Sequence, residues 1–322
     1  MTGRPTVVVT RRLPSPVEDR LRTLFDARLN ITDAPLDEAA LAGAMRDADA
    51  LVPTVTDRIT ATLLGTPGRR VRIVSTFGVG FNNIDVAAAR EHGVVVTNTP
   101  DVLTDDTADL AITLLLMVAR RTGEGERLVR AGDWTGWRPT QMLGTRVTGK
   151  TLGLIGFGRI GRAVAARASG GFRMRVVWHD PFAGDDAASL GGERRMSIEA
   201  VLQESDFVSL HCPATPETRH LMNADRLAAM RPGAFLINTA RGDVVDETAL
   251  VRALREGTIA GAGLDVFERE PAVSRELLAM DNVVLLPHLG SATEETRVAM
   301  GNRAVDNLAA FFGGAAPRDR VA

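Results

Sequence analysis

The stretch "GLIGFGRIGRAVAARA", residues 153–168, is the most informative segment of this 322-residue chain. It places Gly156, Gly158 and Gly161 between an apolar run and an alanine-rich run. In a strand–loop–helix unit, the first glycine allows a tight turn and the second lets the backbone approach a pyrophosphate. The third lets helix and strand pack closely, which leaves the diphosphate at the helix N-terminus. The spacing and its flanks therefore predict a dinucleotide-binding sheet.

An acidic residue follows the glycines at the spacing that such folds use. Asp180 ends the run "RVVWHD", nineteen residues after Gly161. A carboxylate there accepts hydrogen bonds from the adenosine ribose hydroxyls and repels a 2′-phosphate. Residues 181–183 are Pro, Phe and Ala, so no arginine follows directly. We expect NAD as the cofactor; NADP stays open because Arg194 and Arg195 come later and could fold back.

Strand-like and helix-like runs alternate on both sides of the glycine loop. The first block has four expected strands, at 6–9, 49–53, 71–76 and 93–98, and the second has six, at 152–155, 175–178, 207–210, 234–238, 260–264 and 283–286. Expected helices cover 14–25, 85–92, one long segment at 105–130, and 292–312. This alternation predicts an α/β protein with two doubly wound parallel-sheet domains.

The bulk composition limits the possible partners and setting. The net charge of −2 gives no polybasic signature, so we expect no nucleic-acid or membrane partner. The N-terminus lacks a secretion signal, and the longest apolar stretch, Leu110–Ala119, is too short to span a bilayer. The single cysteine, Cys212, excludes an intramolecular disulfide and a cysteine-based metal cluster. We therefore expect a cytoplasmic protein and assign no metal site.

Four polar side chains follow successive strands of the second block. Arg241 comes after 234–238, Asp265 and then Glu270 come after 260–264, and His288 comes after 283–286. Ligands of doubly wound sheets bind beyond the carboxyl ends of the strands, so these groups should share one sheet edge. Taken singly, each also fits an ordinary role as a surface arginine, a helix cap, a loop charge or a strand-end ring.

Together the four groups suit hydride transfer to a 2-oxo acid. A guanidinium such as Arg241 binds a carboxylate and polarises the adjacent carbonyl. An imidazolium such as His288 donates the proton that the new alkoxide needs. Glu270 is the expected partner that stabilises the charged imidazole, and Asp265 the neighbour that orients Arg241 or tunes the site.

Several longer stretches resemble the D-isomer-specific 2-hydroxyacid dehydrogenases, from about Leu51 to the last helix. They are "STFGVGFNNIDV", "TNTPDVLTDDTADLAITLLL", "GKTLGLIGFGRIG", "SLHCPATPETRH", "MRPGAFLINTARGDVVDE", "GLDVFEREP" and "PHLGSAT". Within that family, "NTPDVLTDDTADLA" and "WTGWRPTQMLG" are most similar to the glyoxylate/hydroxypyruvate reductase branch, also called D-glycerate dehydrogenase.

The resemblance implies a domain arrangement and a catalytic set. A flavodoxin-like substrate-binding domain would comprise residues 1–99 and 290–322. A Rossmann NAD(P) domain, residues 100–289, would be inserted in it, with a dimerisation helix and loop at about 103–145. Arg241, Glu270 and His288 fall on the family's catalytic Arg, Glu and His, and a homodimer is expected.

The resemblance also implies individual contacts. Amides of Val79 and Gly80 would hold the substrate carboxylate, and Ser291 would lie beside the catalytic histidine. Trp137 would line the partner subunit's site or pack against a neighbouring helix. The implied cofactor contacts are Thr107, Gly156, Phe157, Gly158, Arg159, Ile160, Gly161, Asp180, His211, Cys212, Pro213, Thr218, Thr239, Ala240, Asp265, His288 and Gly290. We interpret Cys212 as a packing residue without a catalytic role.

The function implied is NAD(P)H-dependent reduction of glyoxylate or hydroxypyruvate to the D-2-hydroxy acid. Two departures bear on it: Phe81-Asn82 replaces the more frequent Tyr-Asp, and Asp180 differs from the arginines of NADPH-using members. Val79 stands where phosphite dehydrogenases carry a lysine, which argues against that relative. Alternatives are a dehydrogenase of lactate-like or phosphoglycerate-type acids, and an NADH-sensing protein similar to the family's corepressors.

Overall fold

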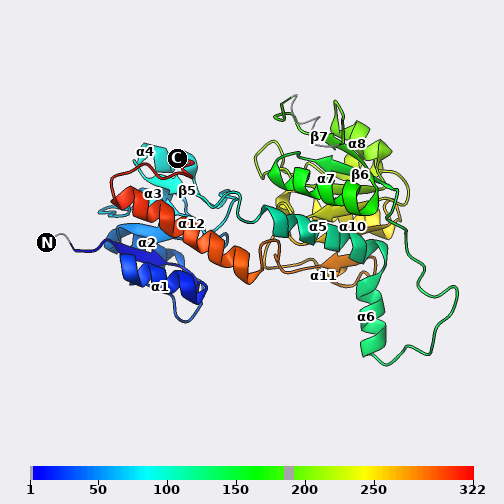
Figure 1. The fold of residues 1–322 in the computed structure, drawn as a ribbon, viewed down its shortest axis with the longest axis horizontal. Helices are drawn as coiled ribbons and strands as arrows, with labels where there is room; N and C mark the ends of the chain where they lie inside the picture. Colours follow the sequence, from blue (N-terminus) through cyan, green and yellow to red (C-terminus); the bar gives the residue numbers. More distant parts are fainter. Residues whose placement is uncertain (1–2, 185–191) are drawn as a thin grey trace. The chain divides into compact units, whose positions relative to one another are not determined.

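The computed structural model describes residues 3–184 and 192–322 and divides the chain into two compact units. Met1–Leu103 and Ala292–Ala322 form one, here called the terminal unit, and Thr104–Ser291 form the other, the central unit (Figure 1). The sequence placed these borders at residues 99 and 290. Each unit is a parallel sheet with helices on both faces, which confirms the predicted fold class.

The terminal unit contains a five-stranded parallel sheet in the order β2-β1-β3-β4-β5. Its strands are β1 (Thr6–Val9), β2 (Asp26–Arg28), β3 (Ala50–Val52), β4 (Ile73–Ser75) and β5 (Val95–Thr97). Its helices are α1 (Ser15–Leu24), α2 (Glu38–Asp47), α3 (Ala61–Leu64), α4 (Val86–Glu91) and α12 (Glu294–Phe312). The sequence missed β2, whose three residues include two charged ones at the sheet edge. The order is that of flavodoxin-like sheets.

Alternating side chains of the strands supply the two cores of the terminal unit. Val7 and Val9 pack with α1 and α12 on one face, and Leu51 packs with α2, α3 and α4 on the other. Gly301 of α12 marks the closest approach to α1, because a Cβ there would lie 2.5 Å from a methyl of Val17. The final helix, α12, therefore covers one face of a sheet that is formed by the first hundred residues.

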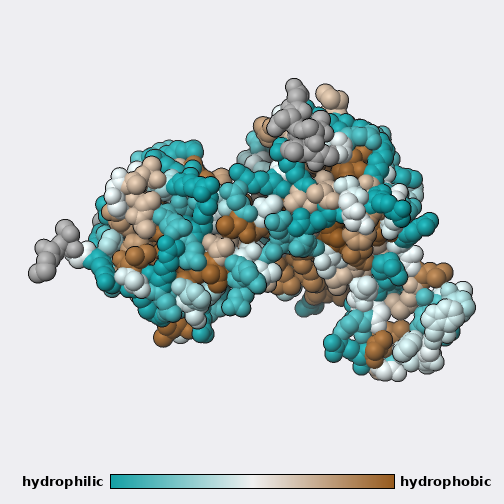
Figure 2. All heavy atoms as spheres, in the orientation of Figure 1, coloured by the Kyte–Doolittle hydropathy of each residue, from teal (hydrophilic) through white to brown (hydrophobic). Residues whose placement is uncertain are grey.

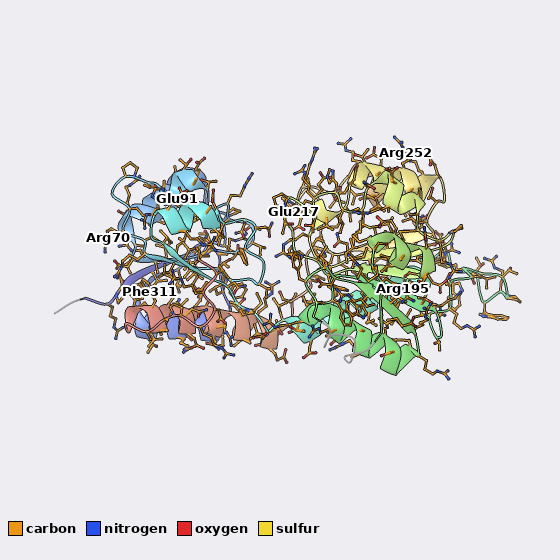
Figure 3. The ribbon with its side chains drawn as sticks, turned by 90° about the horizontal axis from the view of Figure 1, so that it is seen from above. Arg70, Glu91, Arg195, Glu217, Arg252 and Phe311 are labelled. Atoms are coloured by element: carbon orange, nitrogen blue, oxygen red, sulfur yellow. The ribbon has the colours of Figure 1, made fainter. Side chains whose placement is uncertain are left out.

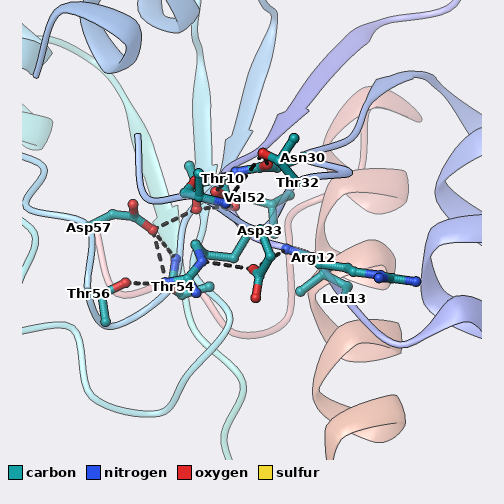
Figure 4. Close-up of polar contacts among 12 residues, drawn as sticks. Thr10, Arg12, Leu13, Asn30, Thr32, Asp33, Val52, Thr54, Thr56 and Asp57 are labelled. Carbon is teal, nitrogen blue, oxygen red and sulfur yellow. Dashed lines mark hydrogen bonds and ion pairs between the residues drawn. The ribbon is translucent and has the colours of Figure 1, made fainter. Parts of the chain in front are cut away.

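Loops at the carboxyl edge of this sheet are tied together by a buried carboxylate (Figure 4). Asp57, 4% exposed, accepts hydrogen bonds from the Thr10 hydroxyl at 2.6 Å and the Thr54 amide at 2.7 Å. Asn83 joins the same cluster, since its amide donates to the carbonyls of Thr54 and Asp57. The loops that follow β1, β3 and β4 thus form one connected edge.

The central unit contains a seven-stranded parallel sheet in the order β12-β11-β10-β9-β6-β7-β8. The strands are β6 (Thr151–Ile155), β7 (Arg175–His179), β8 (Glu193–Arg194), β9 (Phe207–Leu210), β10 (Phe235–Asn238), β11 (Gly261–Leu264) and β12 (Val283–Leu285). The sequence predicted six strands for this sheet and missed β8. This edge strand has only two residues, too few to show a periodicity. The order reverses between β6 and β9, which is where such sheets bind nucleotides.

Helices cover both faces of the central sheet. α5 (Thr104–Ala119) and α7 (Arg159–Phe172) share one core with Leu152 and Trp178, while the other face packs against the remaining helices. Those are α8 (Ile198–Glu204), α9 (Ala224–Ala228), α10 (Glu247–Arg255) and α11 (Arg275–Leu278), with a 3-10 turn at Gly242–Val244. No helix of the described residues is long and apolar enough to cross a membrane.

The prediction of a single long helix at 105–130 is wrong, because the helix is interrupted between α5 and α6 (Thr122–Arg130). Arg121 takes a left-handed conformation at φ +53° and pairs with Glu124 one turn on. Gly123 and Gly125 open α6, and glycine is a poor helix former. Figure 1 shows that α6 projects away from the rest of the central unit and that a long loop follows it. We call residues 122–146 the arm; it returns to the end of α5, where Thr145 N–H donates to Ala119 O at 2.7 Å.

We predict that Gly301→Ala lowers the free energy of unfolding by about 1–3 kcal/mol, because the added methyl overlaps Val17 across the α1–α12 contact. Gly43→Ala in α2 is the matched control: a Cβ there meets nothing within 4 Å, so it should stabilise by about 0.5–1 kcal/mol. Urea unfolding of the full chain measures both. Equal stability of the two variants would contradict the packing described for α12.

Candidate active site

The glycine loop between β6 and α7 has three different local requirements. Gly156 adopts φ +94°, and a Cβ there would lie 2.6 Å from the carbonyl carbon of His211. A Cβ on Gly161 would lie 2.4 Å from the carbonyl oxygen of Gly156. Gly158 is different, because a Cβ there meets nothing within 4 Å. Two glycines therefore serve the fold, and the third borders open space.

The start of α7 completes a cradle for a phosphate group. Gly158 is the N-cap of this fourteen-residue helix and supplies no side-chain cap. Its first N–H groups are left for an external acceptor, and the helix dipole favours an anion there. The open side of Gly158 leaves room for that anion. The residues present fit the pyrophosphate of a dinucleotide.

Asp180 is held beside this cradle by backbone amides. Its carboxylate accepts hydrogen bonds from Phe157 N–H and Phe182 N–H, both at 2.8 Å. Arg194 reaches the main-chain oxygen of Asp180 at 3.4 Å and stacks over Trp178 with its guanidinium 5.6 Å from the ring centroid. Of Arg194 and Arg195, Arg194 is thus the one that reaches Asp180.

The other arginine is committed to an ion-pair cluster at the sheet edge. Arg195, labelled in Figure 3, binds Glu204 at 2.6 Å and Glu193 at 2.8 Å. Arg175 bridges the same two carboxylates. Hydrogen bonds from these arginines lower the pKa of Glu193 and Glu204 to about 2, so the cluster stays ionised at neutral pH.

His288 and Glu270 form a direct pair at the carboxyl ends of β11 and β12. His288 Nδ1–H donates to Glu270 Oε2 at 2.8 Å, and both side chains are about one-third exposed, at 31% and 32%. The other oxygen of Glu270 accepts from Phe267 N–H at 3.0 Å. Burial alone would raise the pKa of Glu270, but His288, the Phe267 amide and Arg241 together hold it below its ordinary value. Glu270 is therefore an anion at neutral pH, and Nε2 of His288 remains to carry a proton.

The backbone of His288 is held in a strained conformation by Asp265. His288 has φ +57°, which a residue with a side chain adopts only when its surroundings impose it. Its N–H donates to the carbonyl oxygen of Asp265 at 2.9 Å. The Asp265 carboxylate then accepts from Leu289 N–H at 2.7 Å and Gly290 N–H at 2.8 Å. Burial raises the pKa of Asp265, and these amides and His288 oppose the rise.

Arg241 follows β10 and lies within reach of the charge on Glu270. Its backbone is fixed because the Asn238 amide donates to its carbonyl oxygen at 2.9 Å. Gly242 must be glycine, since a Cβ there would lie 1.9 Å from the carbonyl of Phe267. Burial lowers the pKa of Arg241, while Glu270 and Asp243 counteract the shift. The sequence predicted Arg241 at this edge but missed Asn238 and Gly242, which position it. The motif "NTARGD", residues 238–243, contains both residues and could have indicated them.

Other predicted contact residues line the ends of β6, β9 and β10. The Thr107 hydroxyl donates to Gly290 O at 2.9 Å, and the Thr218 hydroxyl donates to Pro213 O at 2.7 Å. Thr239 has a buried hydroxyl without a partner among the described residues, as expected of a group that awaits a ligand. Arg159, Ile160, His211, Cys212 and Ala240 lie in the loops or helix start at these strand ends.

Two buried groups among them, the His211 ring and the Cys212 thiol, are uncharged at neutral pH. Burial lowers the pKa of His211 to about 4, so its ring is neutral and shares a hydrogen bond with the Ser209 hydroxyl at 2.9 Å. Burial raises the pKa of Cys212 to about 11, so its thiol stays protonated. A protonated thiol is a poor nucleophile, which suits a packing residue.

The remaining predicted residues lie in three different places. Val79 and Gly80 belong to the terminal unit, in the loop after β4, where both are half-buried. Ser291 is buried at the end of the central unit, directly after Gly290. Trp137 lies on the arm and is 80% exposed.

Comparisons with known proteins identify the family of the chain. Residues 112–290 match the model of the D-isomer-specific 2-hydroxyacid dehydrogenase NAD-binding domain. The chain is 44% identical to glyoxylate reductase of Thermococcus litoralis over 99% of its own length and 97% of that protein.

Solved structures give the same result. An NADPH-dependent glyoxylate/hydroxypyruvate reductase from Sinorhizobium meliloti, in complex with NADP and malonate, superposes with a TM-score of 0.88 at 39% identity, over 99% of this chain and 97% of that one. D-lactate dehydrogenase from Aquifex aeolicus, with NAD and lactic acid, has a TM-score of 0.82 at 29% identity over 96% of both chains. The chain therefore belongs to the D-isomer-specific 2-hydroxyacid dehydrogenase family of NAD(P)-dependent oxidoreductases.

Proposed function

We propose that this protein reduces glyoxylate or hydroxypyruvate to the corresponding D-2-hydroxy acid. The observation that carries the proposal is the His288–Glu270 pair, held beside Arg241 at the carboxyl edge of a nucleotide-binding sheet. The relatives named glyoxylate reductase, at about 44–45% identity over nearly the full chain, support the substrate class.

The residues divide the chemistry between them. A bound nicotinamide supplies the hydride that reaches C2 of the acid. Arg241 binds the carboxylate in a fork and polarises the 2-oxo group, which develops negative charge as the hydride arrives. Nε2 of His288 donates a proton to that oxygen, and Glu270 stabilises the imidazolium beforehand. In the oxidative direction, His288 takes the same proton back.

We propose NAD as the preferred cofactor. Asp180, fixed by two amides, presents its carboxylate where a 2′-phosphate would bring a second negative charge. Arg194 is the feature that favours NADP, because it lies against the backbone of Asp180. A carboxylate held by the fold outweighs one edge arginine that stacks on Trp178.

We assign substrate binding to the terminal unit and cofactor binding to the central unit. Amides of Val79 and Gly80 hold the substrate carboxylate from the loop after β4 in this proposal, and Ser291 lies next to Gly290 in the His288 loop. Thr107 supports that loop through Gly290 O and adjoins the nicotinamide. The structure in complex with NADP and malonate shows that a small dicarboxylate binds a relative.

We propose that the protein is a homodimer joined through the arm. α6 buries none of its residues, and Val129, Trp134, Trp137 and Leu143 are 54–80% exposed there. Figure 2 shows apolar residues among the hydrophilic ones on this projection. A projecting arm with exposed tryptophans is typical of a segment that packs on a second copy. Trp137 then contributes to the partner's substrate site.

We predict that His288→Asn lowers kcat for glyoxylate by about 10²–10⁴-fold, because asparagine cannot transfer the proton. NADH affinity, measured by fluorescence titration, should stay within about twofold. His220→Asn is a matched control, since His220 also has a left-handed backbone and pairs with Glu268 at 2.9 Å. Near wild-type turnover by His288→Asn would refute the acid/base assignment.

We predict that Glu270→Gln moves the basic limb of the reduction profile to lower pH by about one unit. Reduction needs the protonated imidazole, and its stabilising anion is lost in the variant. The wild-type anion is present over the whole profile, because the pKa of Glu270 lies below its ordinary 4.5. Profiles of kcat/KM between pH 5 and 9 measure the shift, with Glu268→Gln as control. A limb that stays in place would mean that Glu270 does not tune His288.

Light scattering in solution should give twice the 34.4 kDa mass of one chain. Replacing Val129 and Leu143 by glutamate places charges on the apolar arm surface and should halve that mass. A wild-type protein of 34.4 kDa would exclude the dimer.

A further inference from the structure

Two successive carbonyl groups of the loop after β4 are bound by the segment that follows β5. The Asn98 side chain donates from Nδ2 to Val79 O at 2.8 Å. Thr99 donates from its backbone N–H to Gly78 O at 3.0 Å. β4 and β5 are paired with Ser75 opposite Thr97, so both segments leave the sheet side by side.

Fixing these carbonyls also fixes the next two amide N–H groups. A trans peptide is planar, and its C=O and N–H point in opposite directions. Both peptides, Gly78–Val79 and Val79–Gly80, are trans. With Gly78 O and Val79 O turned toward residues 98–99, the N–H groups of Val79 and Gly80 turn away from that segment together.

Successive N–H groups that face one way form an anion-binding concavity. Within residues 3–184 and 192–322, neither Val79 N–H nor Gly80 N–H donates a hydrogen bond. Both residues are half-buried, whereas Gly78 is buried. The carbonyl side of the loop is thus satisfied inside the unit, and the amide side is left for an external acceptor.

The main chain of Asn98 is held from two sides. It is 8% exposed, its N–H donates to Asp319 O at 3.2 Å, and its carbonyl accepts from Asn307 Nδ2 at 3.3 Å. Asn307 lies on α12 and also binds the Asp319 carboxylate at 3.1 Å. The C-terminal part of the chain thus holds the main chain of Asn98, while the side-chain bond to Val79 O is a separate contact that Asn307 does not touch.

We propose that Asn98 is a positioning residue for substrate binding: its side-chain amide orients the Val79–Gly80 peptide so that the amides receive the substrate carboxylate. This rests on the proposed assignment of that carboxylate to Val79 and Gly80. Asn98 itself touches no reacting atom. Its effect falls on binding, because the carboxylate keeps its charge throughout hydride transfer and is held alike in ground and transition states.

The test compares Asn98→Asp and Asn98→Ala with Asn307→Ala in the full-length enzyme, assayed with glyoxylate and NADH. Asn98→Ala removes one neutral hydrogen bond to Val79 O, and KM should rise about 2- to 10-fold with kcat nearly unchanged. Asn98→Asp places a carboxylate against that oxygen and should raise KM further. The inhibition constant of oxalate, a non-reducible acid, should rise in parallel, while NADH affinity stays unchanged.

Asn307→Ala is the control for a merely structural role, because it loosens the same network without touching Val79. It should lower the melting temperature and leave the KM for glyoxylate near wild type. A wild-type KM in both Asn98 variants, a fall confined to kcat, or an equal rise of KM in Asn307→Ala would each overturn the proposal.

The remaining outcomes are also decisive. If the wild type reduces no 2-oxo acid, the proposed function fails whatever the Asn98 variants do. If both Asn98 variants melt below the assay temperature, ¹⁵N spectra of the wild type with NADH replace them. Oxalate must then shift the amide signals of Val79 and Gly80, and the Asn98 side-chain amide must exchange slowly; failure of either result overturns the proposal.

Discussion

The proposed catalytic edge depends on the buried carboxylate of Asp265. This residue is 1% exposed and receives N–H groups from Leu289 and Gly290 on its two side-chain oxygens. Its main-chain oxygen receives the N–H of His288. A buried carboxylate is costly unless it is hydrogen-bonded, so the three amides of the His288 loop and Asp265 stabilise one another. Removing the carboxylate would free the strained φ of His288 and with it the geometry of the His288–Glu270 pair.

Both units use the same device, in which side-chain amides and carboxylates fix backbone that then presents functional groups. Asn238 fixes the carbonyl of Arg241 in the central unit, and Asn98 fixes that of Val79 in the terminal unit. Beside the glycine loop the roles are reversed, because the backbone N–H of Phe157 holds the side chain of Asp180. A planar peptide has two polar ends, and holding one end inside the fold directs the other toward a ligand. The proposed site residues therefore lie on backbone that the fold holds in place at the strand ends.

The sequence predicted much of this arrangement because its signals were local. Glycine spacing identified the strand–loop–helix unit, and β-rich runs located ten of the strands to within two residues. The strands β2 and β8 escaped, because two or three residues at a sheet edge carry no periodicity. The break at Arg121 also escaped, since nothing but the weak helix formers after it marked the end of α5. Contacts between distant segments, such as Asn98 with Val79 or Gly242 against Phe267, depend on tertiary packing and leave no pattern in the chain.

The most direct test of the proposed function is the initial rate of cofactor oxidation by the wild-type protein over a panel of acids. The panel contains glyoxylate, hydroxypyruvate, pyruvate and phosphohydroxypyruvate, each with NADH and with NADPH. The assignment of Arg241, Glu270, His288 and Asp180 predicts the highest kcat/KM for glyoxylate or hydroxypyruvate with NADH, and D-glycerate as the product from hydroxypyruvate. A highest kcat/KM for pyruvate or the phosphorylated acid, or no turnover of any 2-oxo acid, would contradict it.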